Sequence, residues 1–371
     1  MVERTSCLAP SLAAFCVSLL SACSQDAVVN APRPMAAWFG EHLAIGTDGV
    51  TACGGSFEAM DRHADLVGKE LMAEEGFELD VYVLPPNFDF ADGPCEDSAC
   101  SYESEIWTTY LPASHEIVHG VRSNAVGWSA VREAPSVLEE GLAEVYGDDV
   151  STVAPTAMLA PVEDVLDGDV VGLAEYQRAG HFVRYLLERY SLDEVMDLAS
   201  AGRSVTLEAA FEEVLGESLT RVLADYAQYP ICSRNDWRIP ILECAGERTP
   251  WIAEAPRRVS WTFLVSCDDD DVIGPRFGRV YTTEVLNLAT PGRFRFETDF
   301  FDLSRAINLF EIKLVRCDTA CDRPSEIVLR NDQWASTQID LEAGTYYVEF
   351  DRLADANDLP AITVELAELS Q

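Results

Sequence analysis

Two neighbouring stretches decide the fold: His115-Glu116-Ile117-Val118-His119 and Pro135-Ser-Val-Leu-Glu-Glu-Gly-Leu-Ala-Glu-Val-Tyr146. Both lie where helical patterns dominate, between residue 113 and about residue 229. On a helix, the i, i+4 spacing places the imidazoles of His115 and His119 on one face, where they can share a zinc ion. Glu116 then faces the open coordination side. The alternative is a pair of surface histidines on an amphipathic helix.

A bare H-E-x-x-H motif needs a third metal ligand, and the residues downstream exclude one source of it. The metzincin pattern requires Gly and His at the third and sixth positions after the motif, where this chain has Arg122 and Ala125. A carboxylate on a second helix remains. Pro135 predicts where that helix begins, and Gly147 predicts where it ends.

These two helices resemble those of the gluzincin superfamily, thermolysin and the aminopeptidase-like peptidases, whose second motif is commonly E-G-x-A-E. The resemblance implies that Glu140 is the third zinc ligand, with twenty residues between it and His119. It also implies that Glu144, one turn later on the same face, receives the N–H of a zinc-binding histidine. Glu139 points about 100° away from Glu140 on the helix, so we expect its side chain to be solvated.

The resemblance also implies a reaction. Two His and one Glu plus a water are the coordination expected of a catalytic zinc, which lowers the pKa of that water. Glu116, as general base, takes the proton while the water attacks a carbonyl.

A third helix, Glu175 to Tyr190, is similar to one in peptidase MA-like proteins, so the resemblance covers roughly residues 36 to 230. It makes Tyr176 the first candidate donor to the oxyanion, with His181, which stands where that pattern usually has Ser, as a rival. For both residues, a packed position without a catalytic role is the alternative.

The sequence predicts an α+β fold. Segments 42–45 and 79–84 are predicted strands on either side of a helix over 57–72, and 105–110 is a third strand. The resemblance implies that residues 36–245 form a zincin-type catalytic domain, a small β-sheet followed by helices that carry the zinc site.

After residue 256 the pattern changes to short β-rich segments separated by Gly, Pro and Asp turns. They lie at 280–288, 293–296, 307–315, 326–329, 345–350 and 362–366. This spacing predicts an all-β sandwich over residues 256–371. The phrase A-G-T-Y-Y-V at 343–348 resembles bacterial pre-peptidase C-terminal domains, which are often appended to secreted peptidases. The acidic run Asp268 to Asp271 is interpreted as a solvated turn, with a Ca²⁺ site as the alternative.

The N-terminus predicts export. The apolar run from residue 8 to 20 is too short to span a bilayer and leads into Leu20-Ser21-Ala22-Cys23. This resembles the lipobox of bacterial lipoproteins, which implies a signal peptide over 1–22 and a lipid on the sulfur of Cys23. Residues 23–35 are then a lipidated tether to a membrane, and Ser24 favours the outer membrane or cell surface. A plain secretory signal is the alternative.

Export to an oxidising compartment changes the interpretation of the cysteines. Eight of the eleven remain after the signal peptide and Cys23 are set aside. Proximity along the chain predicts three disulfides, and elimination predicts the fourth: Cys95–Cys100, Cys232–Cys244, Cys317–Cys321 and Cys53–Cys267. A Cys-ligated structural metal is the alternative, although no pair has C-x-x-C spacing.

The charge excludes a protein that binds nucleic acid by neutralising phosphates, because 64 Asp and Glu face 26 Lys and Arg, a net charge of −38. The leading hypothesis is an exported zinc metallopeptidase acting on a peptide or protein. One alternative is a surface lipoprotein that binds a protein or glycan and keeps zinc for structure, although such a site has no use for the base Glu116. Another is a zinc hydrolase of a substrate other than a peptide.

Overall fold

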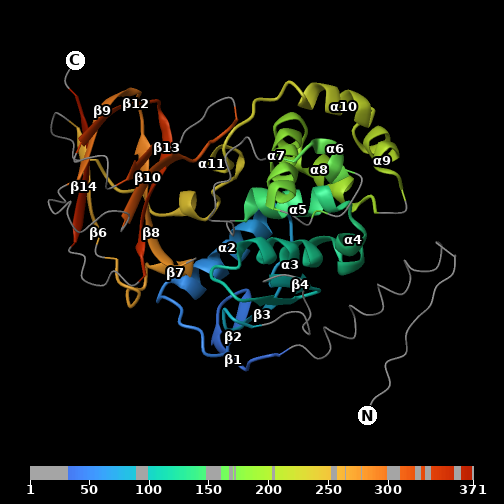
Figure 1. Ribbon diagram of the computed structural model, residues 1–371, viewed down its shortest axis with the longest axis horizontal. Coiled ribbons are helices and arrows are strands. Elements are labelled where there is room, and N and C mark those ends of the chain that lie inside the picture. The colour runs from blue at the N-terminus through green and yellow to red at the C-terminus, as the bar shows by residue number, and fades with distance from the viewer. Residues whose placement is uncertain are drawn as a thin grey trace, which may run out of the picture.

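Two sets of elements follow one another along the chain, and Figure 1 shows them side by side. The computed structural model describes residues 32–88, 99–147, 160–166, 170, 173–202, 205–251, 257–263, 265–276, 278–298, 310–321, 327–330, 336–354 and 361–369. The first set mixes strands with helices, and the second contains strands only. The predicted α+β class is therefore confirmed. The predicted signal peptide, Cys23 and Cys95 lie outside the described residues.

The first set begins with a five-stranded mixed sheet in the order β1-β2-β3-β5-β4. Parallel pairing joins β2, β3 and β5, so that Ile45 lies opposite Val81, and Val81 opposite Ile106. The two edge strands, β1 and β4, run antiparallel to their neighbours. The strands are β1 Ala36–Phe39, β2 Leu43–Thr47, β3 Leu79–Val83, β4 Ala99–Tyr102 and β5 Glu105–Thr108.

Helices cover this sheet and stack above it (Figure 1). They are α2 Ser56–Glu70, α3 Ser114–Val126, α4 Trp128–Glu133, α5 Ser136–Tyr146, α6 Val162–Leu166, α7 Leu173–Arg189, α8 Leu192–Ser200, α9 Leu207–Val214, α10 Leu219–Tyr226 and α11 Arg234–Trp237, followed by a short 3-10 helix at Glu243–Ala245. The predicted start of α5 after Pro135 and its end before Gly147 are confirmed. Because α2 and α3 pack on the sheet and α5 packs between α3 and α7, the motif helices meet inside the molecule.

Two glycines bring these helices close to their neighbours. A Cβ at Gly120 on α3 would lie 3.1 Å from a methyl of Leu79, so this glycine fits the helix tightly against the sheet. A Cβ at Gly141 on α5 would lie 2.7 Å from the carbonyl oxygen of Ala179 on α7. The absence of a Cβ at both positions therefore lets α3 and α5 approach their neighbours this closely.

The second set forms two antiparallel sheets, in the orders β11-β10-β13-β8-β7 and β12-β9-β14-β6. Aromatic and aliphatic side chains of both sheets form one buried cluster, with Phe294, Val348 and Val364 fully buried in it. This arrangement is the predicted β-sandwich. Its strands are β6 Arg258–Phe263, β7 Ile273–Arg276, β8 Arg279–Leu288, β9 Gly292–Thr298, β10 Phe310–Arg316, β11 Ile327–Arg330, β12 Ser336–Leu341, β13 Gly344–Leu353 and β14 Ile362–Glu368.

Disulfides join the two sets. The bonds are Cys53–Cys267, Cys232–Cys321 and Cys244–Cys317. The predicted pair Cys53–Cys267 is confirmed, whereas the predicted pairs Cys232–Cys244 and Cys317–Cys321 are wrong. Cys100 is also disulfide-bonded.

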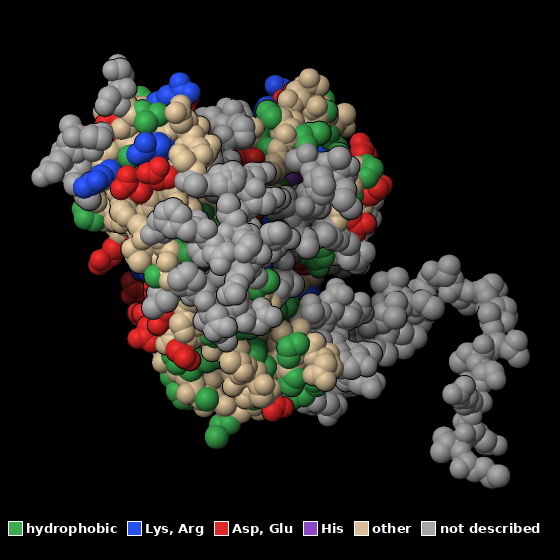
Figure 2. All heavy atoms as spheres, turned by 60° about the vertical axis from the view of Figure 1, so that its left-hand side comes forward, with side chains coloured by type: hydrophobic (Ala, Val, Ile, Leu, Met, Phe, Trp, Pro, Cys, Tyr) green, Lys and Arg blue, Asp and Glu red, His purple; other side chains and the backbone are tan. Residues whose placement is uncertain are grey.

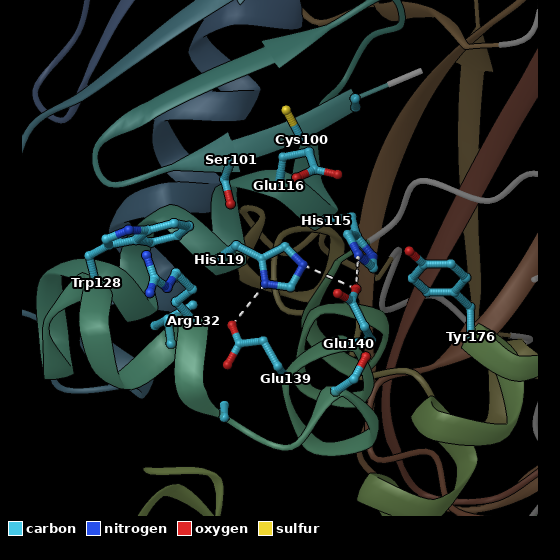
Figure 3. A pocket seen from close by; sticks show the side chains of 14 residues that line it. Cys100, Ser101, His115, Glu116, His119, Trp128, Arg132, Glu139, Glu140 and Tyr176 are labelled. Carbon is cyan, nitrogen blue, oxygen red and sulfur yellow. Dashed lines mark hydrogen bonds and ion pairs between the residues drawn. The ribbon is translucent and has the colours of Figure 1, made fainter. Parts of the chain in front are cut away.

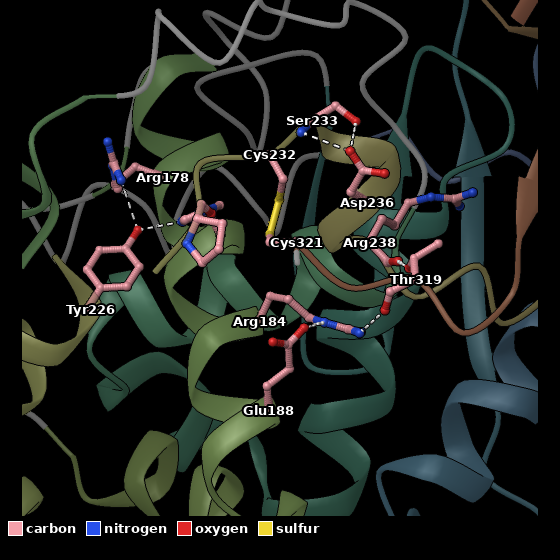
Figure 4. The surroundings of a disulfide bond; sticks show 12 residues. Arg178, Arg184, Glu188, Tyr226, Cys232, Ser233, Asp236, Arg238, Thr319 and Cys321 are labelled. Atoms are coloured by element: carbon pink, nitrogen blue, oxygen red, sulfur yellow. Dashed lines mark hydrogen bonds and ion pairs between the residues drawn. A yellow bond between two sulfur atoms is a disulfide. The ribbon is translucent and has the colours of Figure 1, made fainter. Parts of the chain in front are cut away.

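The two predictions failed because the segment that links the helices to the sandwich lies beside the end of β10. Each of its cysteines therefore meets a sulfur across the boundary rather than its neighbour along the chain. Figure 4 shows this for Cys232 and Cys321, beside which Arg184 donates to the carbonyl of Thr319, and the Thr319 hydroxyl donates to the carbonyl of Arg238 at 3.0 Å.

The acidic run also lies at this boundary. A Cβ at Gly54 would lie 2.7 Å from the carbonyl oxygen of Asp269, and Asp269 itself accepts a hydrogen bond from the amide of Ser266. The run is therefore a turn against the start of α2. Figure 2 shows acidic side chains on several parts of the visible face, in keeping with the net charge. No helix among the described residues has the length and apolar character that crossing a membrane requires.

Candidate metal centre

Helix α3 carries the first motif into the interior. His115, Glu116 and His119 each expose less than a tenth of their surface, although all three are polar. The apolar residues between and beside them, Ile117 and Val118, are fully buried in the main core. The motif thus lies on a helix that has no solvated face along this turn, and its polar atoms need partners.

Helix α5 supplies the partner that brings the two imidazoles together. Glu140 Oε2 lies 3.1 Å from His115 Nε2 and 3.2 Å from His119 Nε2. The two rings meet edge to face with centroids 5.0 Å apart, and one ligand atom from each of the three residues lies within 4.8 Å of the others. Figure 3 shows the three side chains converging on one point.

This donor set fits a zinc ion. Two ligand atoms that are about 2.0–2.2 Å from one zinc ion at a tetrahedral angle lie about 3.3 Å apart, close to both measured separations. Each histidine presents its Nε2 atom to the common point, and its Nδ1 atom is held by another residue. Imidazole nitrogen and carboxylate oxygen are ligands that zinc accepts, so His115, His119 and Glu140 are the residues that would hold it.

A carboxylate and an arginine stand behind His115. Its Nδ1 atom lies 3.3 Å from Oε1 of Glu144, whose side chain is buried, and Arg234 lies 3.3 Å from Oε2 of the same carboxylate. This is the contact that the gluzincin resemblance implied for Glu144. A charged partner on Nδ1 fixes the orientation of the ring and leaves Nε2 for the metal.

A matching pair stands behind His119, and here the sequence-based expectation was wrong. Glu139 is buried rather than solvated, and its Oε1 atom lies 2.8 Å from His119 Nδ1. Its other oxygen lies 3.1 Å from Nη1 of Arg122, which is fully buried on α3. Because α5 crosses directly over α3, adjacent residues of α5 reach both sides of the same imidazole. The side chains of Glu139 and Glu140 therefore point about 100° apart on α5, and both still face the interior.

The carboxylates raise the pKa of both imidazoles. Burial alone lowers the pKa of His119, but Glu140 and Glu139 outweigh it and raise that pKa to about 10. Burial is likewise outweighed at His115, where hydrogen bonds to Glu140 and Glu144 raise the pKa. The two histidines in turn lower the pKa of Glu140 against its burial. The trio is therefore strongly coupled, and a metal binding there displaces protons from it.

The trio opens into a cavity of about 310 Å³. Its walls come from five elements: β4 at one side, α3 and α5 at the centre, α4 and α7 at the ends (Figure 3). The lining residues are Ala99, Cys100, Ser101, His115, Glu116, His119, Trp128, Val131, Arg132, Ala134, Ser136, Glu139, Glu140 and Tyr176. Glu116 lines the cavity without belonging to the trio.

Tyr176 and His181, the two candidates for the oxyanion donor, have different environments. The Tyr176 ring lies edge-on to His115 with centroids 5.7 Å apart, and Figure 3 shows its hydroxyl directed toward the trio. His181 does not line the cavity. Its Nε2 atom donates to the carbonyl of Pro230 at 3.0 Å, and its Nδ1 atom accepts from the hydroxyl of Tyr226 at 2.7 Å. Burial lowers the pKa of His181 to about 4. His181 thus lies in the core and not among the described lining residues, which fits the alternative of a packed position without a catalytic role.

Several residues of this site were not predicted. Glu139 and Arg122 were missed because the helical angle was measured against Glu140 alone, although Arg122 follows His119 by three residues and so shares its buried face. Trp128 and Arg132 come from the short helix α4, which carries no motif. Only the packing of α4 beside α3 brings them to the cavity.

Two of the three comparisons with known proteins found no match. No family model matches the chain, and no curated protein matches it. Among solved structures, it is similar to the isomalto-dextranase of Arthrobacter globiformis T6 complexed with panose, with 21% identity and a TM-score of 0.15. That similarity covers 24% of this chain and 16% of the other. At this TM-score and coverage it carries no argument about fold or function.

Proposed function

We propose that this chain is a zinc-dependent metallopeptidase of the gluzincin type, exported and anchored to a membrane through lipid on Cys23. One observation carries the proposal: Nε2 of His115, Nε2 of His119 and an oxygen of Glu140 converge in a cavity that Glu116 also lines. Three protein ligands with an open position are typical of catalytic zinc, whereas structural zinc sites are closed by four.

Zinc bound there supplies a Lewis acid that polarises the substrate carbonyl and makes a water molecule more acidic. Glu116 receives the proton of the attacking water and later passes it to the nitrogen of the leaving amine. The carboxylate is suited to this work because it is 8% exposed and faces the cavity, so little bulk water competes for the proton.

Tyr176 stands on the far side of the trio from α4 (Figure 3). We assign its phenolic hydroxyl as the donor that stabilises the negative charge developing on the carbonyl oxygen. Glu144 and Glu139 act as positioning residues, because each holds one imidazole through its Nδ1 atom. A zincin-type fold for residues 36–245 is part of this proposal, supported by the mixed sheet below α3 and by the two motif helices crossing above it.

The test separates metal binding from turnover in the soluble chain from residue 24 onward. We expect near-stoichiometric zinc and hydrolysis of a peptide library in the wild type. Glu140→Ala should lose the metal, and Glu116→Gln should keep the metal and lose turnover. Glu133→Gln makes the same chemical change on an exposed carboxylate of α4 outside the cavity and should leave both quantities at wild-type levels.

Elemental mass spectrometry measures the zinc, and cleavage of the library is followed by peptide mass spectrometry. A Glu116→Gln protein that hydrolyses peptides as fast as the wild type would refute the mechanism. Wild-type protein that takes up no zinc would refute the whole proposal.

A further inference from the structure

One arginine that lines the cavity has no partner among the residues that the structure describes. Arg132 on α4 is exposed and lines the cavity that holds the proposed zinc ligands. It is the only Lys or Arg among the lining residues that the structure describes. Within the described part of the chain, no residue forms a hydrogen bond or an ion pair with its guanidinium.

An arginine without a partner in the described part of the chain is unusual at this site. The other two arginines near the trio are paired internally, Arg122 with Glu139 and Arg234 with Glu144. The chain carries 64 acidic residues against 26 basic ones, so a carboxylate is easy to place beside any arginine. Arg132 therefore presents five N–H donors to the cavity, in a planar fork that matches a carboxylate.

The position of Arg132 places its charge at one end of the cavity. Figure 3 shows Arg132 and Trp128 on one side of the trio and Tyr176 on the other. The Trp128 ring is held against Tyr102 of β4, with centroids 4.9 Å apart, and the buried Val131 anchors α4 from below. At the end of the cavity that Arg132 lines, the Trp128 ring thus forms an aromatic wall whose position is fixed by packing.

The other ionisable side chains of the described lining are three glutamates, two histidines and Tyr176. Glu116, Glu139 and Glu140 all contribute to the walls, but Glu139 is paired with Arg122 and Glu140 belongs to the proposed zinc site. Arg132 therefore supplies the positive charge of the described lining at the α4 end of the cavity, away from the proposed zinc site. A guanidinium–carboxylate contact is charge-assisted and can be bidentate, which gives it both strength and orientation.

We propose that Arg132 is a specificity-determining residue that binds a substrate carboxylate on the α4 side of the scissile bond. This inference rests on the proposed peptidase function and names its substrate class: peptides with an Asp or Glu side chain, or with a free C-terminal carboxylate, close to the bond that is cleaved.

Matched peptide pairs test the inference and separate the two sources of the carboxylate. One arm uses internally quenched peptides that differ by Glu or Gln at each of the three positions on either side of the cleaved bond. The other arm uses peptides that end in a free carboxylate or in an amide. In one of the two arms, we expect kcat/KM of the wild type to be about 10- to 100-fold higher for the peptide with the carboxylate than for its partner.

Arg132→Gln should bring that ratio to about one, and Arg132→Glu should invert it. Arg221→Gln removes a positive charge from an exposed position on α10 outside the cavity and should leave the ratio unchanged. The same peptides are titrated by calorimetry into zinc-loaded Glu116→Gln protein, with and without Arg132→Gln, so that binding is measured without turnover.

Each outcome decides the inference. A wild-type ratio near one in both arms, or a ratio that survives Arg132→Gln, overturns it and leaves the peptidase proposal standing. Binding that favours the carboxylate member and depends on Arg132, in a protein whose wild type cleaves none of the peptides, supports the carboxylate site and counts against the peptidase. Equal binding of both members with no cleavage overturns both.

Discussion

The buried pair of Arg122 and Glu139 makes the sharpest prediction about stability. Glu139→Gln removes the negative charge and keeps the size of the side chain. The amide oxygen can still accept from Nδ1 of His119, so the ring keeps a partner. Arg122, which is fully buried, loses the only carboxylate within ion-pair distance among the described residues. The substitution therefore leaves a positive charge in the interior without a counter-charge.

The expected cost follows from that burial. Removing one partner of a buried ion pair costs about 3–5 kcal/mol, because the other charge stays desolvated. With an unfolding entropy of about 2.1 cal/mol/K per residue over a chain of this length, the loss lowers Tm by about 4–6 °C. The double variant Arg122→Met, Glu139→Gln removes both charges and should recover most of the loss, since a well-packed apolar replacement of a buried pair is often neutral.

Scanning calorimetry on the metal-free proteins measures this without interference from zinc. Glu133→Gln, an exposed carboxylate on α4, serves as the matched control and should stay within about 0.5 kcal/mol of the wild type. The reasoning is refuted if Glu139→Gln lowers Tm no more than that control does. It is also refuted if the double variant is as unstable as Glu139→Gln alone, because the loss would then not come from an orphaned charge.

Two further predictions concern the helices around the site. His181 has a pKa of about 4 in the fold, below its usual value, so the unfolded chain binds more protons between pH 6.5 and 4 and stability falls as pH falls through that window, by up to about 3 kcal/mol. Denaturant unfolding from pH 7.5 to 4.5 should show this slope in the wild type, and an equal slope in His181→Gln would contradict the assignment. Gly141→Ala places a methyl against Val183 and the backbone of Ala179, so α5 must shift away from α7 at a cost of about 1–3 kcal/mol. Its Tm and its zinc affinity should both fall, and an unchanged affinity would show that Glu140 tolerates the shift.

Helical periodicity predicted part of the site. The spacing within H-E-x-x-H fixes which side chains share a helix face, and the sequence distance from His119 to Glu140 is enough for α4 and the return of α5 over α3. The predicted strands near 42–45, 79–84 and 105–110 are all present. The edge strands β1 and β4 were not predicted, because four-residue segments such as Ala99–Tyr102 lack the β-branched residues that signal a strand.

The sequence by itself determined that His115 and His119 share one helix face and that the chain changes to β-strands after residue 256, because each depends on residue type and spacing within one segment. The resemblance to gluzincins added Glu140 as the predicted third ligand. Only the tertiary structure decided which groups meet across segments. It placed Glu139 and Arg122 behind His119, brought Arg132 into the cavity, and moved Cys232 and Cys244 to partners on the sandwich. Those contacts are set by how rigid elements pack, and helical periodicity contains no information about which surface of another element lies opposite.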